Sequence, residues 1–134
     1  MGSVINLKYH VVLTTKCRKP ALIGIEQSVY QAFRKVEEVS DFTILDMNVE
    51  GGNYIHLAIK MSLRFSVSSM ISRIKGLTLH YLWETEQAHL AQFYWGEKRK
   101  LWHGAYFCAT MGDVSKDTVL NYIKKQNGPR EHRL

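Results

Sequence analysis

Cysteine is scarce in this chain, and so are the features of secreted and membrane proteins. The only cysteines, Cys17 and Cys108, are far apart and have no C-x-x-C or metal-ligand spacing. This pattern is not that of a disulfide framework and favours a reduced protein of the cytoplasm. No apolar run is long enough to predict a membrane span, and residues 1–15 lack the basic and long apolar regions of a signal peptide.

Acidic residues are also outnumbered. The chain has 18 lysines and arginines against 12 aspartates and glutamates, for a net charge of +6 and a pI near 9.4. A basic balance favours an anionic partner, of which nucleic acid is the commonest. The charge gathers in short clusters, for which solvated loops and helix faces are the alternative interpretation. The clusters are Lys16, Arg18 and Lys19; Arg73 and Lys75; and Lys98, Arg99 and Lys100.

Length and composition predict one globular domain over residues 1–134, since 46% of the residues are hydrophobic and 22% are charged. Residue patterns predict strands over 5–15, 42–50, 54–61 and 105–110. Helical spacing of apolar residues predicts helices over 25–40, 66–86 and 113–126, and 87–100 is expected to be a loop. The order β-α-β-β-α-β-α is typical of a ferredoxin-like α+β fold. Such a fold has a split-βαβ antiparallel sheet with helices on one face, here with one added C-terminal helix.

Two polar pairs stand out within these elements. Tyr54 and His56 lie two residues apart on a predicted strand and therefore share a face. Tyr122 and Gln126 lie one turn apart on the last predicted helix. The pairs can converge on one site. Spacing alone favours ordinary roles, namely a hydrogen-bonded strand histidine, a core tyrosine and a solvent-facing glutamine.

Four segments, taken in order, resemble one protein family. They are "YHVVLTTKCRKPAL" (9–22), "NYIHLAIKM" (53–61), "SVSSMISRIKGLTLHYLWE" (66–84) and "LWHGAYFCATMGDVSKDTVLNYIKKQ" (101–126). The second lies where the family has a histidine-hydrophobic-histidine strand, and the last contains Gly-Asp-Val-Ser followed by Tyr-Ile-x-x-Gln. Over nearly its whole length the chain is similar to the single-tyrosine HUH transposases of bacterial and archaeal insertion sequences.

The resemblance implies a transposase that cuts and rejoins single-stranded DNA at hairpin-bearing element ends through a 5′-phosphotyrosine intermediate. Tyr122 takes the position of the nucleophile. His56 and Gln126 take the positions of ligands to a divalent metal, Mg²⁺ or Mn²⁺, which holds the scissile phosphate. Family members act as homodimers, so the resemblance also implies a composite site with Tyr122 from one protomer and His56 from its partner.

The chain departs from the family motif at Tyr54, which stands where the first histidine is expected. A neutral phenol is a weaker metal ligand than an imidazole. Either Tyr54 leaves a gap that water or a carboxylate of Glu50 or Asp46 fills, or the chain binds hairpin DNA without cutting it. Our working hypothesis is a weakened metal site, with Tyr54 as a further candidate ligand. His10 and His103 are assigned no metal role.

The basic clusters are the expected contacts to DNA phosphates. Exposed aromatic side chains, with Tyr94, Trp95 and Trp102 as candidates, are expected to stack on single-stranded bases. Two alternatives to cleavage stay open. One is a module that only binds hairpin DNA, and the other is a ferredoxin-like RNA-binding domain. No strand carries the aromatic-rich RNP1 pattern that the RNA-binding alternative would need.

Overall fold

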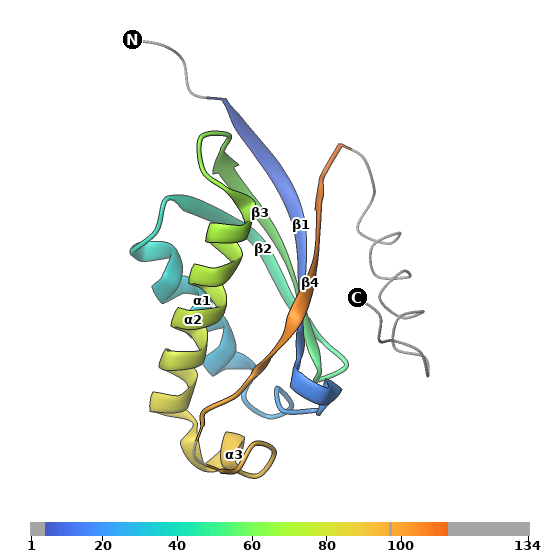
Figure 1. Ribbon diagram of the computed structural model, residues 1–134, viewed down its shortest axis with the longest axis vertical. Helices are drawn as coiled ribbons and strands as arrows, with labels where there is room; N and C mark the ends of the chain where they lie inside the picture. Colours follow the sequence, from blue (N-terminus) through green and yellow to red (C-terminus); the bar gives the residue numbers. More distant parts are fainter. Residues whose placement is uncertain (1–4, 97, 113–134) are drawn as a thin grey trace.

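The computed structural model describes residues 5–96 and 98–112 (Figure 1). The expected helix over 113–126 lies outside these residues. The described elements are β1 (Asn6–Thr15), the 3-10 turn η1 (Lys16–Arg18), α1 (Glu26–Glu38), β2 (Phe42–Glu50), β3 (Tyr54–Ser62), α2 (Val67–Thr85), α3 (Gln87–Ala91) and β4 (Trp102–Thr110).

The strands form one sheet in the order β2-β3-β1-β4, and all neighbouring strands are antiparallel. β3 lies between β1 and β2, the two strands that α1 connects, which is the split-βαβ arrangement. Helices α1 and α2 lie together on one face of the sheet, as Figure 1 shows. The predicted ferredoxin-like α+β class is therefore confirmed for the sheet and its two covering helices.

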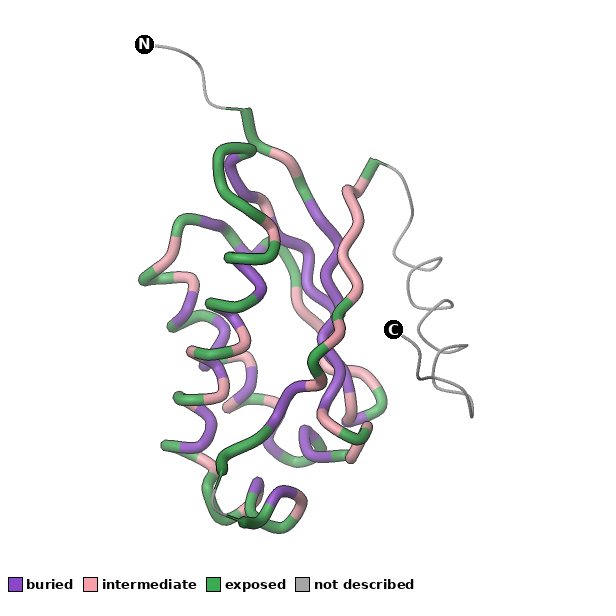
Figure 2. Tube along the Cα trace, in the orientation of Figure 1, coloured by how far each residue is buried: buried purple, intermediate pink, exposed green. Residues whose placement is uncertain are grey.

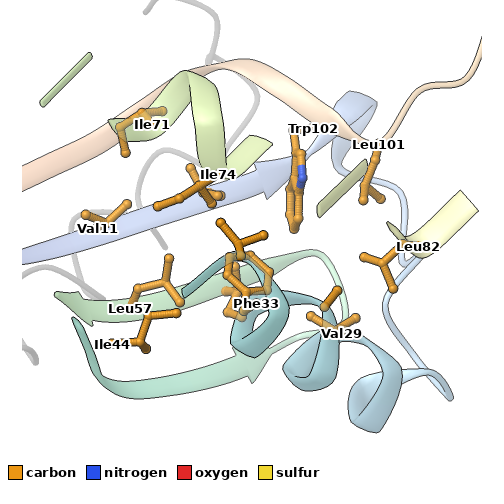
Figure 3. Close-up of a cluster of buried hydrophobic side chains, with 14 of the residues drawn as sticks. Val11, Val29, Phe33, Ile44, Leu57, Ile71, Ile74, Leu82, Leu101 and Trp102 are labelled. Atoms are coloured by element: carbon orange, nitrogen blue, oxygen red, sulfur yellow. The ribbon is translucent and has the colours of Figure 1, made fainter. Parts of the chain in front are cut away.

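The hydrophobic core fills the space between the sheet and these two helices. Alternate strand residues such as Val11 and Leu57 point toward the helices, where Phe33 of α1 meets them (Figure 3). Figure 2 shows burial along most of β1 and β3, the two inner strands, whereas β2 and β4 are largely half-buried or exposed. The helix predicted over 25–40 is confirmed as α1, whose buried residues lie at helical spacing: Val29, Ala32, Phe33 and Val36.

Helix α2 begins after Ser66, whose hydroxyl accepts a hydrogen bond from the Ser69 amide and caps the helix. Its buried face does not consist of its apolar residues alone. Leu77 and Tyr81 are only partly buried, whereas Thr78 is fully buried. Thr78 tolerates burial because its hydroxyl donates to Ile74 O at 2.6 Å and accepts from the Trp102 indole at 2.9 Å.

Among the described residues, neither α2 nor any other helix is long and apolar enough to cross a membrane.

Two boundaries between 86 and 105 differ from the predictions. The segment expected to be a loop contains the short helix α3, which buries Leu90. Strand β4 begins at Trp102 rather than at residue 105, because Trp102 pairs with Thr15 of β1. The Trp102 ring also packs edge-on against Phe33, with ring centroids 6.1 Å apart. These contacts come from distant parts of the chain, so local residue patterns did not indicate them.

Cys17 and Cys108 are free thiols, as their separation predicted. Burial raises the pKa of Cys108 to about 11. This thiol is therefore protonated at neutral pH and is a poor nucleophile and metal ligand.

Candidate active site

Strand β3 divides its side chains between the two faces of the sheet. Ile55, Leu57 and Ile59 belong to the core beneath the helices, whereas Tyr54 and His56 are buried outside it. The predicted alternation along this strand is confirmed. We call the side of the sheet opposite α1 and α2 the histidine face. Its buried members are His10, Val12, Thr14, Tyr54, His56 and Ala58.

His10 meets His56 on this face, although the two residues come from different strands. His56 lies opposite Val12 of β1, and His10 lies opposite Ala58 of β3. The histidines are therefore diagonal neighbours, a placement from which long side chains reach one another. Nδ1 of His10 is 3.0 Å from Nε2 of His56, and the ring centroids are 5.2 Å apart. Sequence reasoning missed this pair because it assigned His10 no face.

Tyr54 lies on the same face as His10 and His56, but its neighbours are Thr14 and Glu50. It lies opposite Thr14 on one side and Glu50 on the other. Burial, and then the negative charge of Glu50, raise the pKa of the Tyr54 phenol above its ordinary value. At neutral pH Tyr54 is therefore a neutral phenol, which is a weak metal ligand.

Glu50 and Asp46, the two carboxylates considered as ligands in place of the missing histidine, do not form a metal site with His56. Asp46 lies opposite Ala58 and accepts a hydrogen bond from the Asn48 side chain at 3.3 Å. Within residues 5–96 and 98–112, no three or more histidine, cysteine, aspartate or glutamate side chains are grouped so that they would hold a metal ion. Tyr122 and Gln126, the other predicted site residues, lie outside the described residues.

The basic cluster at the end of β1 forms a tight turn held from several sides. Cys17 and Arg18 both have left-handed backbone angles, with φ of 58° and 52°, which are uncommon for residues other than glycine. The Lys16 amide donates to Leu101 O at 2.7 Å, and the Tyr94 hydroxyl donates to Lys16 O at 2.7 Å. These bonds fix the direction in which the basic side chains leave the sheet.

Lys19 connects this turn to an exposed aromatic ring. Its Nζ donates to Phe93 O at 2.9 Å and lies 5.0 Å from the centre of the Trp95 ring. The Trp95 side chain is 71% exposed, whereas Tyr94 and Trp102 are buried. Of the three aromatic residues predicted to stack on bases, Trp95 is thus the one whose ring is accessible.

The turn and Trp95 lie at the end of the sheet where β1 ends and β3 begins at Tyr54. The Thr15 amide, at the end of β1, donates to Asn53 O at 2.9 Å, and the Leu22 amide donates to Gly52 O at 2.9 Å. Residues 51–53 form the hairpin turn before Tyr54, with left-handed glycines at Gly51 and Gly52. A positively charged turn therefore lies at the end of the sheet where Tyr54 begins β3.

The other basic residues predicted to contact DNA fall into two groups, one hydrogen-bonded to neighbouring elements and one exposed. The Arg73 guanidinium donates to Ser40 Oγ at 2.8 Å and also to Val39 O, so it caps the end of α1. Lys75 Nζ donates to Gly104 O at 3.0 Å, and burial lowers the pKa of this lysine. Both side chains thus hold α2 to its neighbours. Lys98, Arg99 and Lys100 are exposed, and the Arg99 guanidinium lies 5.9 Å from the Trp83 ring centre.

Several known proteins are similar to this chain. The transposase for insertion sequence element IS200 of Salmonella typhimurium (strain LT2) is 31% identical over 122 residues, which cover 90% of this chain and 77% of the relative. A crystal structure of a transposase from Deinococcus radiodurans R1 has a TM-score of 0.78 at 24% identity, covering 94% of this chain and 95% of the other. A REP-associated tyrosine transposase bound to a REP hairpin has a TM-score of 0.58 at 17% identity, covering 93% and 72%.

The two solved structures establish a shared fold. Family membership rests on sequence. The family described as "Transposase IS200 like" matches residues 3–126, which is most of the chain. The Salmonella relative matches over most of its own length as well. The chain therefore belongs to the IS200-like transposase family.

Proposed function

We propose that this transposase cuts and rejoins single-stranded DNA at hairpin-bearing element ends through a 5′-phosphotyrosine intermediate. The observation that carries the proposal is the buried His10–His56 pair, which lies on the face of the sheet that α1 and α2 leave uncovered. A positively charged turn lies at the Tyr54 end of the sheet, and positive charge near the site favours an anionic substrate such as DNA. The single domain over 1–134 would act on cellular DNA in the cytoplasm.

Tyr122 is the proposed nucleophile. Its hydroxyl oxygen attacks the scissile phosphorus, the new oxygen–phosphorus bond forms, and the bond to the 3′ oxygen breaks. Tyrosine is then esterified to the 5′ phosphate, and the departing 3′ oxygen takes up a proton. Attack by a 3′-OH on this ester reverses the step and frees the tyrosine. The ester conserves the energy of the phosphodiester, so rejoining needs no nucleotide cofactor.

A free tyrosine has a pKa of about 10 and is a weak nucleophile at neutral pH. When bound, a divalent Mg²⁺ or Mn²⁺ ion would favour the phenolate and offset the charge that builds on the phosphate. His56 offers an imidazole nitrogen for such an ion, and Gln126 offers an amide oxygen, which suits a hard cation.

We propose that DNA enters over the turn of Lys16 and Arg18. These side chains would contact phosphates, and an unpaired base would stack on Trp95, beside which the Lys19 ammonium lies. Lys98, Arg99 and Lys100 would extend the basic surface. Arg73 and Lys75 contribute less directly, because their hydrogen bonds tie α2 to α1 and β4.

We further propose a homodimer with composite sites, in which Tyr122 of one protomer serves His56 of its partner. In the part of the chain that the structure describes, β2 and β4 form the edges of the sheet. Edge strands have unpaired backbone groups with which a second copy can pair.

A second candidate function is hairpin DNA binding without cleavage. It is favoured by Tyr54, whose neutral phenol replaces the imidazole expected at that position. Under this alternative the basic turn and Trp95 keep their roles, and no covalent bond to DNA forms.

Covalent capture separates the two candidate functions. Labelled single-stranded hairpin DNA is incubated with the full chain and Mn²⁺ and is then separated on a denaturing gel. Cleavage by a tyrosine nucleophile should give a slower band that survives SDS. Hairpin binding in a native gel without such a band would support the binding-only function.

The stacking role of Trp95 gives a matched test of DNA binding. Trp95→Ala should weaken binding of single-stranded hairpin DNA by about fivefold or more, since stacking on an aromatic ring contributes roughly 1–3 kcal/mol per base. Phe65→Ala removes another exposed aromatic ring, which is 42% accessible and lies outside the proposed path. Fluorescence anisotropy measures both dissociation constants. Equal losses in the two variants would argue against a specific stacking site at Trp95.

A further inference from the structure

The two histidines approach each other through nitrogen atoms. His10 Nδ1 and His56 Nε2 are 3.0 Å apart, with the ring planes inclined at 44°. Both side chains are buried, at 4% and 1% exposure. The pair therefore brings two imidazole nitrogens within hydrogen-bond distance of each other at one point on the histidine face.

The spacing between the nitrogens fits two ligands of a single metal ion. With metal–nitrogen bonds of about 2.1 Å, two ligands at a right angle have their nitrogens about 3.0 Å apart. Strands β1 and β3 pair over their whole length, so the backbone positions of both ligands are held firmly. A site built on paired strands is more rigid than one built on loops.

We propose that His10 of β1 is the second imidazole ligand of the metal site, in the role that position 54 of β3 does not fill. This inference rests on the proposed function, because it concerns the metal of the same site. Sequence reasoning gave His10 no metal role, because it did not assign this residue to a face of the sheet. Here the pair of imidazoles spans two strands.

The register gives this site a definite position. Along the sheet, Tyr54 lies opposite Thr14, His56 opposite Val12, and His10 opposite Ala58. His10 and Tyr54 therefore flank His56 from opposite directions. An ion held by His10 and His56 would therefore lie toward Ala58 and away from Tyr54. Two imidazoles also favour Mn²⁺ over Mg²⁺, whose preferred ligands are oxygen atoms.

Mn²⁺ binding by the full chain, without DNA, tests the assignment. Electron paramagnetic resonance of free Mn²⁺ gives the dissociation constant for each variant. We expect His10→Ala and His56→Ala each to weaken Mn²⁺ binding by more than about tenfold, since even residues that only support a ligand act on this scale. His10→Phe keeps a ring at the buried position and removes both nitrogens, so it should show the same loss while remaining folded.

Two control variants should leave Mn²⁺ affinity unchanged. His80→Ala removes an exposed histidine of α2, and Tyr54→Phe removes the phenol oxygen. Both should bind Mn²⁺ as the wild type does. Wild-type affinity in both His10 variants, or a loss in Tyr54→Phe equal to that in His56→Ala, would overturn the role of His10. Covalent capture of hairpin DNA is measured in parallel. If it persists in the His10 variants while their Mn²⁺ affinity is unchanged, only this inference fails and the proposed function stands.

Discussion

Tyr122→Phe should form no covalent complex with hairpin DNA. The substitution removes one oxygen atom, the proposed nucleophile, and leaves a ring of nearly the same shape. Because Tyr122 is the only proposed nucleophile, the band that survives SDS should disappear entirely rather than weaken. Native-gel binding of the same hairpin should be unchanged, since binding is proposed to depend on the basic turn and Trp95.

A tyrosine elsewhere in the chain provides the control. Tyr106 lies on β4 and is 39% exposed, so Tyr106→Phe removes an accessible phenol without disturbing the core. This variant should form the covalent complex at the wild-type level. A Tyr122→Phe protein that still yields an SDS-resistant band would show that the nucleophile is a different residue.

Phe33→Ala should destabilise the fold severely. The Phe33 side chain is fully buried, and its ring packs against Trp102, which lies at the start of β4. Removing a buried phenyl ring leaves a cavity and costs about 3–5 kcal/mol. Domains of this kind are stable by only about 5–15 kcal/mol, so the loss is a large share of the total.

Urea unfolding followed by circular dichroism measures this change. The midpoint of thermal unfolding should also fall, by roughly 10–20 °C. Leu63→Ala serves as the control, because this side chain is 54% exposed and exposed substitutions usually change stability by less than about 0.5 kcal/mol. A Phe33→Ala protein as stable as the Leu63→Ala protein would contradict the placement of Phe33 in the core.

The sheet and its helices were predictable from sequence because their signals are local. The alternation through Ile55 and Leu57, the stripe through Phe33 and the cap at Ser66 each depend on residues within one element. The start of β4 was predicted wrongly because it depends on the partners of Trp102 in β1 and α1. A pattern read along the chain does not include such partners.

The difference between local patterns and long-range contacts also explains which of the two histidines was found from sequence. His56 was identified from a motif within one strand. His10 was not, because the two histidines are 46 residues apart and their proximity depends on the register between β1 and β3. Part of that signal was present in β1, where His10 shares a face with Val12 and Thr14 rather than with Val11. Likewise, Trp95 is exposed whereas the neighbouring Tyr94 is buried. Composition alone does not indicate this difference in exposure.

Strand β1 also limits how this chain can change over evolution. It pairs with β3 on one side and β4 on the other, it carries His10, and it leads directly into the basic turn. One inserted or deleted residue between His10 and Lys16 would turn one of them relative to the other, because side chains alternate between faces. His10 would then face the apolar core, or the turn would be directed elsewhere. Among related sequences, we therefore expect insertions and deletions in the loops rather than within β1.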